Sequence, residues 1–428
     1  MIDRWSSHVY ISLFFSARHW LFLLSFLALV PVSHALSFEE ALRLAQSLAP
    51  QLKAAEEKLA AARAAESASG ALPDPKLVLG LDNFPVDGPN AYSLSRDFMT
   101  MRRIGLMQDV PNRAKRQARV AAARGQVAVA EVEAEVARLT VLREAALAWI
   151  SRHTVEQQLA RLNALAEENR LFEAAVRARV AAGSATPAEV VAPRQEAALI
   201  AERRDELLAR RSQAIAALRR WIGPAADEPL TGPAPDWSLT PELLVHRLHR
   251  HPELRAFDAR ARVMDAEVAA AQAEKRPDWS LELAYQQRGP QFGNLVSVQL
   301  SLDLPVFPGA RQDPRIAARR AERAALDAER VAVFREHRAE LEADLADYQR
   351  LSQALRRQRE VLLPLAEEKV ALTLAAWRGN RASLADLIAA RRERIEAELR
   401  AIELEGERLQ LAARLHYTYG YPDPGEQK

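Results

Sequence analysis

The sequence predicts a mainly α-helical fold that also carries membrane β-strands, arranged as one plan used twice. Charged residues make up 27% of the 428 residues and aromatic residues only 6%, a composition typical of long packed helices. Motifs recur in the second half of the chain at a nearly constant offset. Each half also contains two short segments in which apolar and polar residues alternate. These observations favour a duplicated helix, strand, strand, long helix and helix plan.

Composition and charge exclude several classes of function. The chain has no cysteine, which rules out disulfides, thiolate metal sites, cysteine nucleophiles and lipidation on a cysteine. Its net charge is only +2, which gives no reason to expect a nucleic-acid partner. No serine–histidine–aspartate, paired-carboxylate or phosphate-loop pattern stands out. We therefore expect a protein that is not an enzyme, with no cofactor and no resident metal.

Residues 1–35 are predicted to be a signal peptide. Arg4 and Arg18 precede an apolar segment over residues 20–30, and small residues follow up to Ala35, as a signal-peptidase site requires. The apolar segment is far shorter than the roughly 20 residues of a membrane-spanning helix, so an uncleaved anchor is the weaker alternative. The pattern indicates export from the cytoplasm.

The exported part is predicted to consist of two repeats. Residues 49–52 match residues 251–254, and further on Glu189 matches Asp386. A proline-rich stretch between the copies is typical of a linker. The predicted divisions are a first repeat over 36–223, a linker over 224–238 and a second repeat over 239–428.

Long helices make up most of each repeat. Ser37 opens a capping box that starts a helix predicted to run to Gly70. The next helix follows Pro111, and about 70 residues at 1.5 Å each give it a length of roughly 100 Å. Pro193 and Pro364 lie within later helices and are expected to kink them. The predicted long helical hairpins cover residues 112–222 and 311–419.

The alternating segments are predicted to be β-hairpins over residues 76–110 and 278–305. In the second hairpin, apolar residues occupy every other position of both segments: Trp279, Leu281, Leu283, Tyr285, Val296, Val298, Leu300 and Leu302. Runs of about 9–11 residues with one apolar and one polar face are typical of transmembrane strands, although a half-buried hairpin of a soluble protein has the same pattern. Four strands cannot close a water-filled barrel, so the chain must associate; two copies give 8 strands and three give 12.

Each helical hairpin is predicted to turn through a short motif at its tip. Gly183 suits the left-handed conformation that ends a helix, and Thr186 can cap the next helix. In the second copy Asn380 takes the place of the glycine, and Ser383 that of the cap. The candidate site residues at these tips are Gly183, Ser184, Ala185, Thr186, Asn380, Arg381, Ala382 and Ser383.

The ordered set of motifs resembles the TolC-like outer-membrane efflux channels. The resemblance covers nearly the whole exported chain and rests on the duplicated plan, the paired tips, and the strand ends at residues 108–111 and 303–307. It implies a homotrimer with a 12-stranded barrel in the outer-membrane lipid of a Gram-negative bacterium and a long α-helical periplasmic tunnel. It also implies that the tips form the tunnel entrance and meet a periplasmic adaptor (membrane fusion) protein, which serves an inner-membrane efflux pump of the resistance-nodulation-division class.

Three methionines near the second predicted strand of the first repeat are relevant to which substance the duct exports. Met99 and Met101, followed by residues 108–111, resemble the CzcC-like heavy-metal branch of the family, which favours metal cations. Thioethers suit soft Cu(I), but lipid-facing packing is the more common use of Met99, Met101 and Met107. Which face of residues 98–110 points to lipid is left open, because Arg103 and Asp109 share the methionines' face.

Three histidines cluster at the start of the second repeat. His246 and His249 are three residues apart on a predicted helix and could bind a metal, with His251 nearby. Solvated histidines at a helix end are the more common outcome. We therefore expect no metal site there.

The leading hypothesis is a passive outer-membrane export duct, with heavy-metal cations as the favoured cargo. The alternatives are a duct for drugs and other small molecules or for type I protein secretion, a periplasmic coiled-coil adaptor protein, and a secreted structural coiled coil. An adaptor should lack alternating strands of membrane length and needs a lipoyl-like half-motif, which the sequence does not contain. A structural coiled coil would not need the strand pairs.

Overall fold

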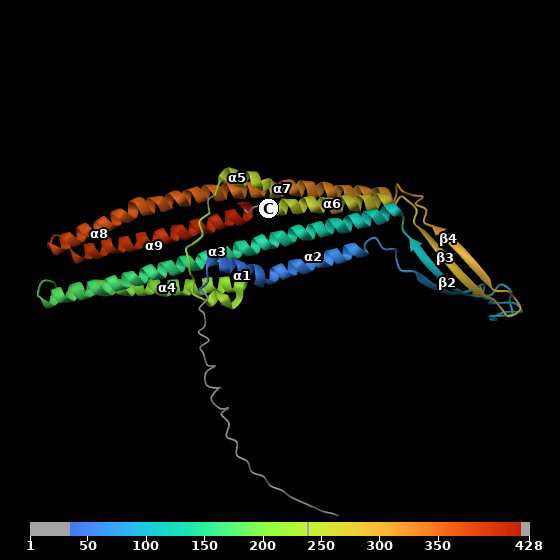
Figure 1. The fold of residues 1–428 in the computed structure, drawn as a ribbon, viewed down its shortest axis with the longest axis horizontal. Helices are drawn as coiled ribbons and strands as arrows, with labels where there is room; N and C mark the ends of the chain where they lie inside the picture. Colours follow the sequence, from blue (N-terminus) through green and yellow to red (C-terminus); the bar gives the residue numbers. More distant parts are fainter. Residues whose placement is uncertain (1–34, 238, 421–428) are drawn as a thin grey trace, which may run out of the picture.

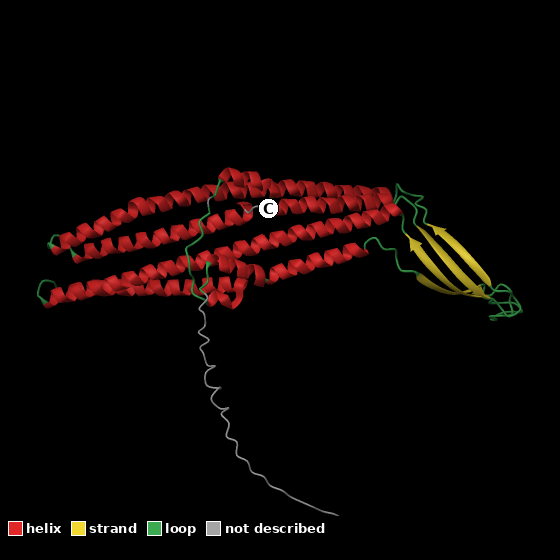
Figure 2. Cartoon of the chain, viewed as in Figure 1, coloured by secondary structure: helices red, strands yellow, loops and turns green. Residues whose placement is uncertain are grey.

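The computed structural model describes residues 35–237 and 239–420, and the predicted signal peptide falls almost wholly outside them. The described chain is a long rod of helices with a small β-sheet at one end (Figure 1). Figure 2 shows how completely helix and strand are separated along this axis. Among the described residues, no helix is both long and apolar enough to cross a membrane.

The first half contains a helical stretch, two strands and a long helical hairpin. Its elements are α1 (Phe38–Leu48), α2 (Pro50–Ala68), β1 (Lys76–Asp82), β2 (Met101–Val110), α3 (Arg113–Ala181), the 3₁₀ turn η1 (Pro187–Val190), α4 (Val191–Ile222) and the 3₁₀ turn η2 (Gly223–Asp227). As predicted, the Ser37 side chain accepts a hydrogen bond from the backbone N–H of Glu40 (3.1 Å) and starts α1. The prediction of one unbroken helix to Gly70 is wrong. Ala49 is extended because the residue before a proline disfavours helical geometry, and Pro50 then starts α2.

The second half follows the same order. Its elements are α5 (Pro241–Arg247), the 3₁₀ turn η3 (Leu248–Arg250), α6 (Pro252–Ala273), β3 (Trp279–Gln287), β4 (Leu295–Leu302), α7 (Gln312–Arg357), the π-helical turn η4 (Gln358–Leu362), α8 (Leu363–Arg378), α9 (Leu384–Leu415) and the π-helical turn η5 (His416–Gly420). The η4 turn directly precedes Pro364, where the missing N–H disturbs the helix without ending the rod. Pro193 lies in the first turn of α4, directly after the 3₁₀ turn η1, and not in the interior of an α-helix.

The helix α3 is the spine of the rod. It packs most extensively against α6 and also contacts α4, α2, α9 and α1. A buried core near the middle of the rod centres on Trp149 and Phe38, whose ring centroids lie 5.4 Å apart. The linker begins against this core, where the buried Arg152 donates to the carbonyls of Ala226 (2.6 Å) and Glu228 (2.8 Å). These contacts fix the joint between the two halves to the spine.

The four strands form one antiparallel sheet in the order β1-β2-β3-β4. The central pairing, β2 with β3, joins the two halves, while β1 and β4 are its edges. At the sheet–helix junction, the Asp278 carboxylate accepts from the backbone N–H of Asn112 (2.7 Å) and from Lys115 Nζ (2.8 Å). Asn112 also caps α3. The direction in which the strands leave the rod is thereby fixed by polar contacts from both halves.

Candidate channel surfaces and a mid-rod histidine cluster

One face of the sheet is apolar across all four strands. The register places Leu77 opposite Leu106, Leu106 opposite Leu283, and Leu283 opposite Val298. These side chains lie more than half exposed, and that of Val298 is 69% exposed. A continuous apolar face of this kind is unusual in water, because contiguous apolar patches are normally covered. The face therefore needs an apolar surrounding.

The opposite face of the sheet is polar and carries an ion cluster. Arg103 Nη2 lies 2.5 Å from Glu282 Oε1, and Arg103 Nη1 lies 3.9 Å from Asp82 Oδ2. Gly105 leaves the space that Glu282 occupies, since a Cβ at residue 105 would lie 2.7 Å from the Glu282 carboxylate. The two faces of the sheet thus differ in chemistry, as one lipid-facing and one water-facing surface require.

The register settles which face of β2 is apolar. Ile104 lies opposite Tyr285, on the apolar face, whereas Met101 lies opposite Asp82 and Met107 opposite Glu282, on the polar face. The interpretation of these two methionines as lipid-facing side chains is therefore wrong. Alternation within β2 alone could not decide this, because Arg102 and Gln108 interrupt the apolar face.

The tip between α3 and α4 has the predicted left-handed turn. Gly183 has φ 73°, and the backbone N–H of Ser184 donates to the Arg179 carbonyl (2.9 Å), which closes the end of α3. The carboxylate of Glu189 then accepts from the backbone N–H of Thr186 (2.8 Å) at the start of the next helical segment. The local sequence is sufficient to form this turn.

The tip between α8 and α9 repeats the geometry with different residues. Asn380 has φ 56°, and the N–H of Arg381 donates to the Ala376 carbonyl (2.8 Å). The Ser383 side chain caps α9 by accepting from the N–H of Asp386 (3.1 Å). In both tips the alanine, Ala185 or Ala382, is half-buried, while the other candidate residues are exposed.

The two tips contact each other in one chain. Arg179 Nη2 lies 3.4 Å from the Asn380 side-chain oxygen, and its guanidinium stacks 4.1 Å over the Trp377 ring. Behind this contact, Phe172, Val176, Trp377, Leu384, Leu387 and Ile388 form a small buried core. The exposed tip residues are thus held on a packed base.

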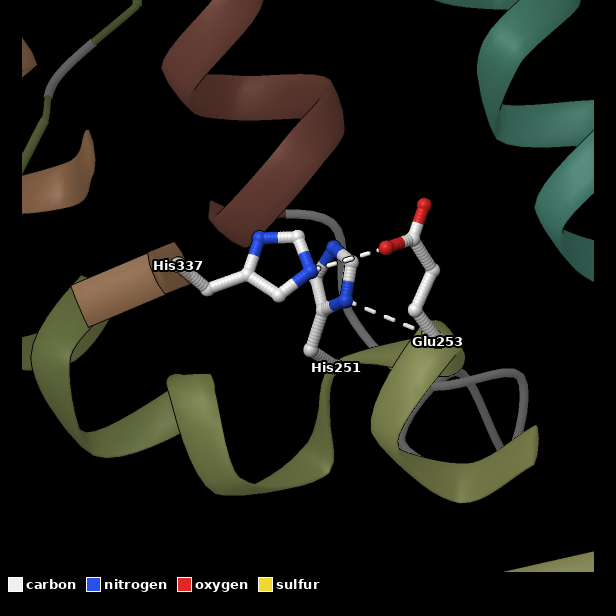
Figure 3. Close-up of side chains that lie close together, drawn as sticks. All are labelled: His251, Glu253 and His337. Carbon is white, nitrogen blue, oxygen red and sulfur yellow. Dashed lines mark hydrogen bonds and ion pairs between the residues drawn. The ribbon is translucent and has the colours of Figure 1, made fainter. Parts of the chain in front are cut away.

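The three histidines that the sequence singled out do not form one site. His246 and His249 are exposed, and His249 stacks on Phe334 with ring centroids 4.8 Å apart. His251 instead turns inward and meets His337 from the middle of α7, with ring centroids 4.2 Å apart. Figure 3 shows that the rings of His251 and His337 and the Glu253 carboxylate converge.

This histidine cluster, defined as His251, Glu253 and His337, is tightly connected. His337 Nε2 lies 2.8 Å from Glu253 Oε2, and the backbone N–H of Glu253 donates to His251 Nδ1 at 3.3 Å. Burial lowers the pKa of His251 to about 4, and the nearby His337 adds to the decrease. The hydrogen bond to Glu253 raises the pKa of His337 and lowers that of the Glu253 carboxyl. No spacing in the sequence could have linked His337 to His251, because the two are paired only by the packing of α7 on α6.

The sequence and the fold were compared with those of known proteins. Residues 41–223 match the family model described as outer membrane efflux protein. The matched residues lie within the first half of the chain, and the described chain as a whole has the fold of TolC-like channels. No curated protein sequence matches the chain.

Solved membrane proteins share the fold across almost their whole length. The crystal structure of a membrane protein from Pseudomonas aeruginosa has a TM-score of 0.77 and 19% identity, covering 90% of each chain. The outer membrane protein VceC from Vibrio cholerae has a TM-score of 0.73 and 19% identity, covering 90% of this chain and 96% of VceC. The MtrE outer membrane channel of Neisseria gonorrhoeae, in its open state, has a TM-score of 0.70 and 16% identity, covering 90% and 88%. These likenesses show that the described chain shares its fold with solved outer-membrane channels.

Proposed function

We propose that the protein is the outer-membrane duct of a tripartite efflux system and works as a homotrimer. The observation that carries the proposal is the sheet, with its exposed apolar face and its two edges, β1 and β4, unpaired within the described chain. Unpaired strand edges cannot remain in lipid, because each free backbone N–H and C=O costs several kcal/mol there. Pairing β4 of one chain with β1 of the next would close 12 strands in a trimer, enough for a water-filled lumen.

In this arrangement the polar face of the sheet lines the lumen. Arg103, Glu282 and Asp82 would then form a charged belt on the inner wall, and the methionines Met101 and Met107 would lie beside it. We propose metal cations as the favoured cargo, on the resemblance of the Met99–Met101 and 108–111 segments to the CzcC-like branch. Drugs and type I secretion substrates are the alternative cargoes.

The exposed tips are proposed to dock a periplasmic adaptor protein, which connects the duct to an inner-membrane pump. They lie at the end of the rod farthest from the sheet (Figure 1). Their exposed residues sit on a packed base, so a partner could bind there without unfolding the rod. Arg381→Glu tests this role, because it reverses an exposed charge without backbone strain.

We expect Arg381→Glu to keep a normal melting temperature and a normal amount of trimer in the outer membrane, since exposed charges contribute little to stability. Export should fall, measured as loss of cargo resistance in cells, and adaptor pull-down should weaken. Full resistance with normal trimer abundance would contradict docking at the tips.

The two faces of the sheet are tested by a matched pair of neighbouring substitutions. Leu300→Arg puts a charge on the apolar face and should impair insertion by about 2–4 kcal/mol if the site lies near the bilayer midplane. Ser301→Arg puts the same charge on the polar face and should leave assembly intact while changing conductance. The readouts are the amount of protein in the outer-membrane fraction and single-channel current. Equal behaviour of the two variants would contradict the assignment of the faces.

A further inference from the structure

We propose that His251, Glu253 and His337 form a resident binding site for a divalent transition-metal cation with zinc-like chemistry, in the wall of the rod. The site lies near the middle of the helical part and far from the sheet (Figure 1). It is independent of what the duct exports, because it holds the ion as part of the folded chain. Neither the family resemblance nor the exposed histidines His246 and His249 points to it.

The ligand atoms are already close to a coordination shell. One ligand atom from each residue lies within 4.8 Å of the others. Zinc binds histidine nitrogen and carboxylate oxygen at about 2.0–2.2 Å, which puts neighbouring ligand atoms of a tetrahedral site about 3.3–3.5 Å apart. To reach that separation, the His337 Nε2–Glu253 Oε2 pair, now 2.8 Å apart, would have to open and the wider pairs would have to close. The cation would replace the proton that His337 Nε2 and Glu253 Oε2 now share at 2.8 Å.

The surroundings of His337 resemble the outer shell of a metal site. Its second ring nitrogen, Nδ1, lies 3.5 Å from the Tyr419 hydroxyl oxygen and 3.8 Å from the Glu340 carboxylate. A metal-bound histidine usually directs its free N–H at such an acceptor, which fixes the tautomer and the ring orientation. The ring of His337 is thus oriented so that Nε2 is the nitrogen offered to the cation.

The pocket around the cluster favours a cation and leaves room for a fourth ligand. It has a volume of about 570 Å³ and is lined by five carboxylates, including Glu336 and Asp344, but by only two arginines. The Glu253 side chain is 50% exposed, which gives solvent access, while His251 is nearly buried. Two histidines and one glutamate with a water in the fourth position are an established zinc ligand set.

Coordination by His251 has one identifiable cost. If Nε2 binds the cation, the remaining proton moves to Nδ1, which then no longer accepts from the backbone N–H of Glu253. That contact is 3.3 Å long, at the weak end for an N–H···N hydrogen bond. Its loss removes a small contribution to the start of α6 and leaves the metal as the new link between His251 and Glu253.

The bound cation would connect two elements that the sequence keeps apart, and a third element contacts one of its ligands. His251 and Glu253 lie at the start of α6, His337 lies in α7, and Tyr419 approaches from η5 at the end of the described chain. Binding to the folded state alone stabilises it by mass action. We therefore expect zinc to raise the melting temperature of the metal-stripped protein.

The test measures zinc binding to the full-length protein in detergent, purified with a histidine-free tag and stripped with a chelator. Calorimetry and elemental analysis should give one zinc per chain, with no comparable binding of Mg²⁺ or Ca²⁺. His337→Gln and Glu253→Gln should each weaken binding by about 100-fold or more and abolish the thermal shift. His251→Asn should do the same while keeping a residue suited to the helix N-cap.

The matched control is His249→Gln, which removes a nearby exposed histidine and should bind zinc as the parent protein does. Circular dichroism separates lost binding from lost folding, and three independent ligand variants guard against one that misfolds. The proposal is overturned if the parent protein takes up less than one-tenth of a zinc per chain. It is equally overturned if all folded variants bind zinc like the parent, or if His249→Gln weakens binding as much as His337→Gln.

Discussion

In each half, the helical stretch before the first strand is interrupted at a matching place. The side chains that pack around the two interruptions differ: they are apolar in the first half and polar in the second. In the first half, Ala49 precedes Pro50 and lies in an apolar core around Phe38 and Trp149. In the second half, His251 precedes Pro252 and packs against His337. The backbone solution is the same, since a proline starts the next helix in both. The first half shows that such a break folds without a histidine in front of the proline.

The comparison teaches that the histidine cluster is an addition to the fold and not a requirement of it. Burying a polar side chain costs free energy unless it is fully paired. His251 makes a 3.3 Å contact to its own helix start and ring contacts to His337 and Tyr419. An apolar packing like that of the first break would stabilise the rod as well or better, so the polar packing favours a binding role.

The largest expected effect is on the free energy of unfolding, and it compares substitutions at the two breaks directly. Trp149 is fully buried, so Trp149→Ala should lower the free energy of unfolding by about 3–5 kcal/mol, through lost contacts and a cavity. His251→Asn, measured without metal, should cost no more than about 1 kcal/mol, because the cap is preserved. Chemical denaturation of the metal-stripped protein in detergent provides both values. A cost for His251→Asn as large as that for Trp149→Ala would mean that the second break depends on its histidine.

A second prediction concerns how the halves are joined. Arg152 is fully buried and holds the linker through the carbonyls of Ala226 and Glu228. Arg152→Met should destabilise the protein by about 3 kcal/mol, because the carbonyls of Ala226 and Glu228 and the Glu156 carboxylate lose a charged donor. Arg350→Met is the control in α7, where the arginine is exposed and pairs with Asp347. We expect it to change stability by less than about 0.5 kcal/mol. Similar melting temperatures for the two variants would contradict the anchoring role.

The smallest effect tests whether the two tips are interchangeable. Apart from its two chain neighbours, no described residue lies within 4 Å of a Cβ at residue 183, so any cost there comes from its positive φ. Gly183→Val should destabilise by about 2 kcal/mol. Gly183→Asn, which imports the residue of the other tip, should cost about 0.5 kcal/mol or less. If both substitutions cost the same, the left-handed turn is not what the glycine provides.

The features that were predictable from the sequence are those set by local chemistry. The left-handed positions Gly183 and Asn380 follow from residue type and neighbouring caps, and both are observed. The apolar alternation of β3 and β4 likewise follows from side-chain period alone. The break at Ala49 is also caused by a neighbouring residue, Pro50. It was not predicted because the residues around it are strong helix formers and favour one continuous helix.

The features that were missed depend on register between distant segments. The face of Met107 is set by pairing of β2 with β3, in which Met107 meets Glu282. The contact between His251 and His337 is set by the register in which α7 packs along α6. Neither can be obtained from spacing within one segment, because the same periodicity allows several registers.

The proposed assembly is tested most directly by the mass of the full-length protein in detergent. Four strands with two unpaired edges should be stable only as a closed ring, so native mass spectrometry should give a species of three chains that resists dilution. Circular dichroism of the same sample should retain its β-content. A stable, monodisperse single chain with full β-content would contradict a barrel formed between chains.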